Sequence, residues 1–289
     1  MVKYRVQLRN VQNVAASTTA LIDVPCGQRY HYIVLTHGYA SGTNTIAGAE
    51  ANITEIRVKS NSRIQRRISG TQLRDMNLLN GTQYDCTGVP NTSPGVTFPI
   101  YFNEPWRETP ADQDALAWST AGWLSFQVEV DLGAASTPTL QAWAVIDDFV
   151  PAPNGPVPGI VKWLKVAAVP GGTIYDYNQL DRRDYLQQIS IYPDSGGSQS
   201  PTQVTFKKNS VILHELTSAA NTALLNNYHM YPGASGRTAG IYDLVFDHDG
   251  LLSSSVPMDG ARDSLLEVSA GSAMSGTQTY IVQRLGPPE

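Results

Sequence analysis

Hydrophobic and polar residues alternate along many short stretches of this chain, and residues 2–8 show the pattern first. There the apolar side chains occupy every second position, and the intervening lysine, arginine and glutamine side chains form a basic face. A period of two predicts a strand with one buried face. The basic face is either a solvated surface or a contact for an acidic partner, such as lipid headgroups or packaged nucleic acid.

Similar short stretches follow through the first half, separated by turns rich in Gly and Pro. They predict strands over 20–24, 30–36, 53–59, 97–102, 123–132 and 140–147. Pro99 places one of these strands at an edge or a bend. The clearest strand carries four apolar residues on one face: Leu124, Phe126, Val128 and Val130. The intervening stretches 38–52, 82–96 and 103–118 are predicted to be surface loops.

One stretch occurs twice. Residues 54–64 read TEIRVKSNSRI and residues 202–212 read TQVTFKKNSVI, at an offset of 148 in a chain of 289. A repeat at about half the chain length indicates two similar domains in tandem. Each copy is predicted to be a strand, a tight Asn-Ser turn and a helix. If the domains are similar, the two stretches occupy equivalent strands.

Helix signals follow both copies of the repeat. In the first, Ser69 or Thr71 is placed to cap a short helix and Gly81 to end it. Its apolar face consists of Leu73, Met76 and Leu79. In the second, Ser210 is predicted to cap a longer helix. That helical face consists of Leu213, Leu216, Ala220 and Leu224. Both helices are expected on the outside of their domains.

The second half repeats the order of the first. It predicts strands over 163–169, 185–192, 202–207, 241–246, 264–269 and 279–285, the last three corresponding to 98–102, 123–130 and 140–146. Four prolines within 151–159 indicate a stiff, extended linker. We therefore predict domains at 1–150 and 163–289, joined by a linker at 151–162.

Each half contains about seven or eight short strands, with no alternation of strand and helix that would favour a parallel sheet. The sequence therefore predicts an all-β fold of two tandem eight-stranded jelly rolls, with a short helix in a loop of each.

Composition agrees with a globular protein of this kind. Hydrophobic residues make up 42% of the chain, charged residues 16%, and the net charge is −5, which argues against general nucleic-acid binding. The two cysteines, Cys26 and Cys86, are expected to be reduced thiols of a protein folded in a cytoplasm, with a bridge between them as the alternative. No apolar run is long enough to predict a membrane span or a signal peptide.

A family resemblance rests on the first 80 residues. Asn13-Val-Ala-Ala16, the apolar strand near Leu21–Val24 and the motif Pro25-x-Gly27-Gln28-x-Tyr30 resemble the opening of the corticovirus major capsid protein. Corticoviruses are tailless bacteriophages with an icosahedral shell around an internal membrane. The strand, turn and helix at 53–80, the chain length and the two halves are similar as well. The resemblance points to the double jelly-roll capsid lineage.

This resemblance implies a structural, non-enzymatic major capsid protein located in the virion shell and synthesised in the host cytoplasm. Three copies would form a pseudo-hexagonal capsomer of six jelly rolls, and capsomers would tile an icosahedral shell. The implied partners are further copies of the chain and other capsid or vertex proteins, with the internal viral membrane as a further candidate and no specific nucleic acid. Loops 38–52 and 82–96 would lie at the outer end or at subunit contacts.

Signals of catalysis or metal binding are scarce. The chain lacks Gly-x-Ser-x-Gly, a phosphate-binding Gly-Lys-Ser/Thr loop, His-Glu-x-x-His and Cys-x-x-Cys. Its histidines are too scattered to suggest a ligand pair, so we assign no catalytic, cofactor or metal residues. Asp247-His-Asp249-Gly250 is the best calcium candidate, with an acidic turn after strand 241–246 as the alternative. Asp147, Asp148, Asp181 and Asp184 are weaker metal candidates. The resemblance implies calcium in the shell, without assigned ligands.

Two further groups suggest carbohydrate chemistry. Four carboxylates could supply a glycosidase pair, although a surface excursion is the favoured interpretation: Glu104, Glu108, Asp112 and Asp114. Four tryptophans could form a sugar platform, with an interface in a capsomer as the favoured interpretation: Trp106, Trp118, Trp123 and Trp143. The alternative functions are therefore a carbohydrate-binding double β-sandwich module and a minor capsid or spike protein.

Overall fold

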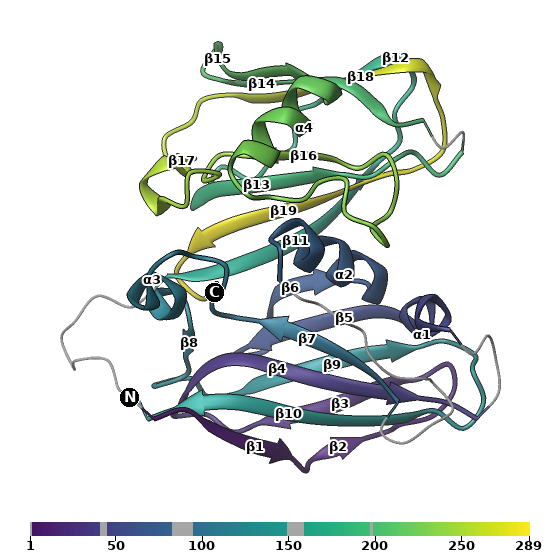
Figure 1. Ribbon diagram of the computed structural model, residues 1–289, viewed down its shortest axis with the longest axis vertical. Coiled ribbons are helices and arrows are strands. Elements are labelled where there is room, and N and C mark those ends of the chain that lie inside the picture. The colour runs from purple at the N-terminus through teal and green to yellow at the C-terminus, as the bar shows by residue number, and fades with distance from the viewer. Residues whose placement is uncertain (1, 41–44, 83–94, 149–158, 197–198) are drawn as a thin grey trace. The chain divides into compact units, whose positions relative to one another are not determined.

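A computed structural model describes residues 2–40, 45–82, 95–148, 159–196 and 199–289 (Figure 1). The chain divides into two compact units. Unit 1 comprises Met1–Leu78, Thr82–Val161 and Pro287–Glu289, and unit 2 comprises Leu79–Gly81 and Lys162–Gly286. Antiparallel sheets make up most of each unit, so the all-β prediction is confirmed.

Unit 1 contains ten strands and three helices among its described residues. The strands are β1 (Tyr4–Leu8), β2 (Val11–Gln12), β3 (Thr19–Val24), β4 (Arg29–Gly38), β5 (Ile53–Ser60), β6 (Arg63–Ile68), β7 (Val96–Tyr101), β8 (Trp118–Ser119), β9 (Phe126–Leu132) and β10 (Thr139–Asp147). The helices are α1 (Ile46–Asn52), α2 (Gly70–Leu79) and α3 (Pro110–Ala115). One sheet has the order β1-β10-β4-β7, and the other β6-β5-β9-β3-β2.

Unit 2 has the same arrangement of main strands, with fewer additional short strands and helices. Its strands are β11 (Ile160–Ala168), β12 (Gly172–Tyr177), β13 (Tyr185–Ile191), β14 (Pro201–Lys208), β15 (Val211–Thr217), β16 (Tyr242–Val245), β17 (Val256–Pro257), β18 (Ser264–Met274) and β19 (Gln278–Gly286). Its helices are α4 (Ser218–Asn227) and the 3-10 turn Leu252–Ser254. The sheets have the orders β16-β13-β19-β11 and β12-β18-β14-β15.

The two units share one topology once the short strands β2, β8 and β17 are set aside. Their eight main strands correspond in chain order, from β1 and β11 to β10 and β19, and occupy equivalent places in two four-stranded sheets. This arrangement is the eight-stranded jelly roll. Strands β5 and β14 are equivalent, as are β6 and β15, so the predicted equivalence of the two repeat copies is confirmed.

Alternating burial holds the sheets together. Along β9, Phe126, Val128 and Val130 point inward, while the residues between them are partly exposed. In unit 2, one core cluster joins residues of both sheets, including Ile189 of β13 and Phe206 of β14. Because each sheet contributes one apolar face, the sheets pack face to face as a sandwich.

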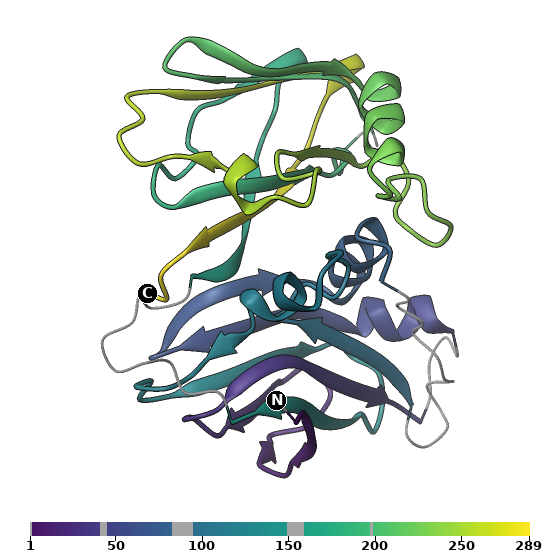
Figure 2. The same ribbon diagram turned by 60° about the vertical axis from the view of Figure 1, so that its left-hand side comes forward.

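The helices that follow the repeats lie between equivalent strands, α2 before β7 and α4 before β16. Leu73 and Met76 of α2 are fully buried, as their spacing predicts. Gly81 has a φ of +66°, the left-handed conformation that glycine adopts easily after a helix. Helix α4 lies outside the main core of unit 2, against β14, β15 and β16 (Figure 2).

Several details differ from the sequence-based predictions. The first strand is not half-buried along its length: Leu8 is buried, whereas Val2 and Tyr4 are exposed. The reason is that β1 ends its sheet and, among the described strands, pairs with β10 alone. Leu124 precedes β9 and is 93% exposed instead of lying on its inner face. Pro99, by contrast, lies on β7 at a sheet edge as predicted.

In both copies, the prediction that a helix directly follows the Asn-Ser turn was wrong. A second strand lies between the turn and the helix, β6 in the first copy and β15 in the second. Leu213 and Leu216 lie in β15 rather than in a helix, and Thr217 caps α4 in place of Ser210. The loop predicted at 38–52 contains α1, and that at 103–118 contains α3. Strand β12 was not predicted.

The predicted linker at 151–162 lies largely outside the described residues, and β11 begins at Ile160. The predicted domain limits, 1–150 and 163–289, stay a prediction. Within the part of the chain that the structure describes, no helix is long and apolar enough to span a membrane.

Candidate functional site

The duplicated hairpin is the best-defined feature that the two jelly rolls share. In each unit it consists of two antiparallel strands, β5 and β6 or β14 and β15, joined by Asn-Ser. Asn61 and Ser62 have φ values of 48° and 66°, and Asn209 and Ser210 have 50° and 65°. Two consecutive positive φ angles define a type I′ turn, whose twist suits a two-residue hairpin.

The turn asparagines also bind a third strand in the same way. The Asn61 Oδ1 atom accepts a hydrogen bond from the backbone N–H of Leu124 at 2.8 Å, just before β9. The Asn209 Oδ1 atom accepts one from the N–H of Arg262 at 2.8 Å, just before β18. Asparagine is therefore favoured twice over, because it tolerates the left-handed backbone and provides this acceptor.

The repeated threonines and lysines make matching contacts as well. Thr54 donates to the backbone oxygen of Asp131 at 3.1 Å, and Thr202 donates to that of Ser269 at 3.2 Å. Lys59 lies 2.5 Å from Glu129, and Lys207 lies 3.7 Å from Glu267. A register shift follows Val58 in one hairpin and Phe206 in the other, again 148 residues apart. The identical residues of the repeat thus have identical structural roles.

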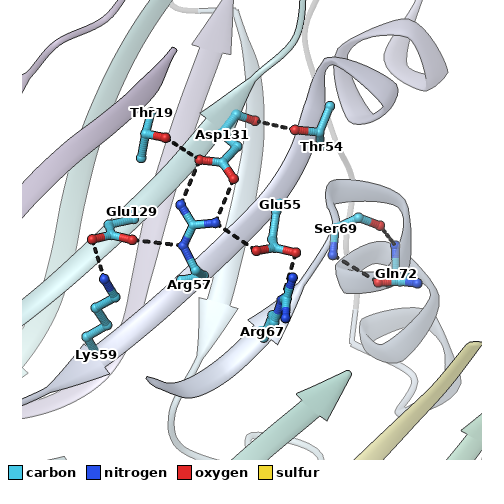
Figure 3. A network of polar contacts seen from close by, with 10 residues as sticks. All are labelled: Thr19, Thr54, Glu55, Arg57, Lys59, Arg67, Ser69, Gln72, Glu129 and Asp131. Atoms are coloured by element: carbon cyan, nitrogen blue, oxygen red, sulfur yellow. Dashed lines mark hydrogen bonds and ion pairs between the residues drawn. The ribbon is translucent and has the colours of Figure 1, made fainter. Parts of the chain in front are cut away.

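The outer face of the first hairpin carries a charged network (Figure 3). The Arg57 guanidinium binds Glu55 at 2.7 Å, Glu129 at 2.8 Å and Asp131 at 2.7 Å. The network continues through Lys59, Arg67 and Thr19, so that it crosses β3, β9, β5 and β6. Its three basic and three acidic side chains balance in charge, which suits a structural role on a partly exposed sheet face.

Electrostatics in this network favour the ionised carboxylates. Partial burial alone would raise the pKa of Asp131, but hydrogen bonds from Arg57 and Thr19 outweigh it and hold this pKa below its ordinary value. The same balance of burial against cationic partners lowers the pKa of Glu129 and of Glu55. Hydrogen bonding to Asp131 raises the pKa of Arg57.

Unit 2 lacks this network at the equivalent positions. Thr205 stands where unit 1 has Arg57, and Ser269 stands where it has Asp131. Among the described residues, only the Lys207–Glu267 contact remains of the charged set. The hairpin geometry therefore does not depend on the charges.

Helix caps complete the common framework. In unit 1, Ser69 and Gln72 form a reciprocal capping box, in which each side chain accepts from the other's backbone N–H, at 3.2 and 3.0 Å (Figure 3). In unit 2, Thr217 accepts from the N–H of Ala220 at 3.4 Å. Ser69 and Thr217 are 148 residues apart, so the repeat extends beyond the stretch in which the sequences are visibly alike.

One position next to the register shift differs most between the units. Arg66 is fully buried in unit 1, where its guanidinium lies over the rings of Phe102 and Trp118 and donates to the backbone oxygen of Val161 at 2.8 Å. Burial lowers the pKa of Arg66 to about 9. The equivalent residue of unit 2 is His214, whose Nε2 atom lies 2.7 Å from the Tyr242 hydroxyl. Sequence reasoning missed Arg66, since buried arginine is rare.

The carboxylates considered for glycosidase chemistry do not form a catalytic pair. Glu104 is buried against Arg107 at 2.5 Å, and Asp114 lies 2.8 Å from Lys3 and 3.0 Å from His31. Glu108 and Asp112 are exposed. Thr109 caps α3 by accepting from the Asp112 N–H at 3.2 Å. The Asp112 carboxylate in turn accepts from the Thr109 hydroxyl at 2.5 Å, so Glu104, Asp112 and Asp114 serve local structure.

The calcium candidate is an acidic turn. The Asp249 carboxylate accepts from the backbone N–H of Leu251 at 3.0 Å and from the Ser254 hydroxyl at 2.6 Å. Within the described ranges, no three His, Cys, Asp or Glu side chains gather as a metal site would require. Three weaker candidates bind cationic side chains: Asp147 with Arg29, Asp181 with Arg284, and Asp184 with Lys162. The fourth, Asp148, accepts from the Tyr4 hydroxyl.

The tryptophans do not form one platform. Trp118 is buried in an aromatic cluster with Phe102, Trp123 and Phe126, which is a commoner use of tryptophan than a sugar platform. Trp106 and Trp143 are half-buried at separate positions. Cys26 is an exposed free thiol, while Cys86 lies outside the described residues.

Comparisons with known proteins agree with this architecture. Residues 5–147 match a family described as the viral coat protein P2 N-terminal domain. Among solved structures, the major capsid protein P2 from bacteriophage PM2 has 20% sequence identity and a TM-score of 0.78, over 99% of this chain and 97% of that one. The STIV MCP has 12% identity and a TM-score of 0.71, over 100% and 97%. No curated protein matches the chain.

The fold and its duplicated hairpin define this chain as a double jelly-roll protein of the viral capsid type. The match of residues 5–147 identifies the first jelly roll as similar to the viral coat protein P2 N-terminal domain and indicates a location in the capsid of a virion. The predicted resemblance to the bacteriophage capsid protein, the double jelly roll and the capsid function are thereby confirmed.

Proposed function

We propose that this chain is the major protein of an icosahedral viral shell and acts by assembling with copies of itself, without catalysing a reaction. The observation that carries the proposal is the duplication: the family match covers the first jelly roll, and the second repeats its eight-strand order and hairpin contacts. Glu104, Asp114, His31 and His214 take part in local hydrogen bonds and ion pairs, which supports a structural role.

The proposed building block is a trimer. Three chains with two similar jelly rolls each present six similar bodies, which approximates sixfold symmetry while leaving the two kinds of jelly roll free to differ. A sixfold outline packs against six neighbours, as a shell requires. Trimer contacts should bury well over about 2,000 Å², the range of permanent interfaces.

The partners of the trimer follow from this geometry. Neighbouring capsomers and the proteins at the vertices would touch its rim, and an internal membrane would face its inner side. The resemblance to a shell that encloses a membrane supports the last partner. Calcium at subunit contacts stays a proposal of the same kind, without assigned ligands.

Light scattering on the purified protein tests the proposal. Three chains of 31.4 kDa predict a particle of about 94 kDa at micromolar concentration. A strict monomer would contradict the trimer, and glycan binding by that monomer would favour the carbohydrate-binding alternative. Electron microscopy of the source material should show icosahedral particles, and quantitative gels should show this chain as their most abundant protein. A low copy number would indicate a spike or minor capsid protein.

A further inference from the structure

Strand β15 leaves an apolar edge open. It pairs with β14 on one side and ends its sheet. Val211 and Ile212 are 59% and 51% exposed, and Leu213 is exposed beside them. Exposed edge strands with apolar side chains invite pairing with another chain, and natural proteins normally cover them or give them charges.

The equivalent edge in unit 1 is covered. Gln65, which corresponds to Leu213, exchanges hydrogen bonds with the backbone of Glu289 at 3.3 and 3.4 Å. Arg66 donates to the oxygen of Val161 at 2.8 Å. In the sequence, Val161 directly precedes the residues of unit 2, and Pro287–Glu289 directly follow them. Within unit 1, these end segments thus lie against β6.

The corresponding segments of the first jelly roll are β1 with the two residues before it, Val2 and Lys3, and Asp148, which directly follows β10. They lie together, since the Tyr4 hydroxyl donates to Asp148 at 3.0 Å. Val2 is 70% exposed and Tyr4 is 43% exposed. Because β1 also ends its sheet, this segment offers a second open edge with apolar side chains.

Charge makes the two edges complementary. Arg5 and Arg9 are exposed along β1, and neither forms an ion pair among the described residues. Glu215 is exposed on β15, and it likewise has no ion pair in that part of the chain. The two arginines and the Glu215 carboxylate attract each other, which helps to select the order of contact.

We propose that the β15 edge of one copy binds the β1 edge of a second copy. The proposal rests on the proposed function, because a coat protein acts in many copies. Each chain offers one edge of each kind, so the contact joins unlike surfaces and repeats from copy to copy until a ring closes. Val2 and Tyr4 would cover the apolar residues of β15, and the arginines would lie near Glu215.

Matched substitutions test this contact by light scattering. Ile212→Glu removes an apolar contact and desolvates a carboxylate against Val2 and Tyr4, so it should weaken trimer formation at least about tenfold and monomers of 31.4 kDa should accumulate. Ile64 is the equivalent exposed residue of the first hairpin, so Ile64→Glu is the control and should leave the trimer intact. A trimer that survives Ile212→Glu unchanged would overturn the proposal while leaving the proposed function in place. A monomeric wild type would instead overturn the proposed function.

A charge exchange keeps the test valid if Ile212→Glu unfolds the chain. Arg5→Glu and Glu215→Arg should each weaken the trimer, and the double variant should restore it. Additive losses in the double variant would count against the contact. A variant with Val2→Cys and Val211→Cys, in a chain that also carries Cys26→Ser and Cys86→Ser, should form disulfide-linked dimers and trimers on oxidation. A link only within single chains would contradict the assignment to a second copy.

Discussion

The two hairpins share a backbone plan and differ in what surrounds it. Both have the same turn, the same register shift and the same contacts from Thr, Lys and Asn. The first adds a buried arginine and a network of six charged side chains, whereas the second has a neutral histidine and exposed apolar residues at its edge. Residues that fix the backbone conformation of the hairpin are therefore the same in both copies. Residues that contact neighbouring strands, the core or solvent differ between them.

The largest expected effect on the free energy of unfolding comes from replacing the buried Arg66. Arg66→Ala would leave the backbone oxygens of Tyr101 and Val161 without this donor and open a cavity beside Trp118, so the free energy of unfolding should fall by about 3–5 kcal/mol. His214→Ala removes one partner of Tyr242, which keeps its bond to the Leu216 oxygen, and should cost only about 1 kcal/mol. Urea unfolding monitored by tryptophan fluorescence measures both. Equal losses would refute the proposed specialisation.

The charged network around Arg57 should contribute less to the free energy of unfolding than the buried Arg66 does. Arg57→Ala leaves three partly buried carboxylates without their shared partner, and the unfolding free energy should fall by about 2 kcal/mol. The matched control is Thr205→Val in the second hairpin, expected to stay within about 1 kcal/mol. Because these side chains are partly exposed, 1 M salt should reduce the loss in Arg57→Ala. A loss that is independent of salt would indicate a packing role instead.

The shared turn should respond equally in both copies. Asn61→Ala and Asn209→Ala each place alanine at a positive φ and remove an acceptor for a backbone N–H, which should cost about 1–2 kcal/mol apiece. The glycine variants keep the backbone conformation and should lose less. Thermal unfolding of the four variants gives the comparison, and a large difference between the two alanine variants would contradict equivalent roles.

The smallest effect is a pH dependence confined to the second hairpin. Burial, with a smaller contribution from His248, lowers the pKa of His214 to about 4. In the unfolded chain this pKa is about 6.5, so between pH 6.5 and pH 4 the unfolded state binds a proton that the folded state does not. The free energy of unfolding should therefore decrease as the pH is lowered, by less than about 1 kcal/mol from pH 7 to pH 6. His214→Gln should reduce this slope in thermal unfolding measured across the same range, and an unchanged slope would exclude His214 as its source.

The sequence predicted the duplication and most strands because those features depend on local pattern. Alternation in β9 and the Asn-Ser turns are visible without tertiary information. Strand β15 was missed because Leu213, Leu216 and Leu224 also fit a helical face, and an exposed edge strand lacks alternating burial. The Arg57 network joins the β5–β6 hairpin to β3 and β9, which lie far from it in sequence, so no local pattern could reveal it.

Cryo-electron microscopy of the virus particle tests the central claim most directly. We predict that the shell consists of capsomers with six jelly rolls of two alternating kinds, and that the hairpins 54–64 and 202–212 occupy equivalent places in them. A shell built from another protein, with this chain absent or confined to the vertices, would contradict the account.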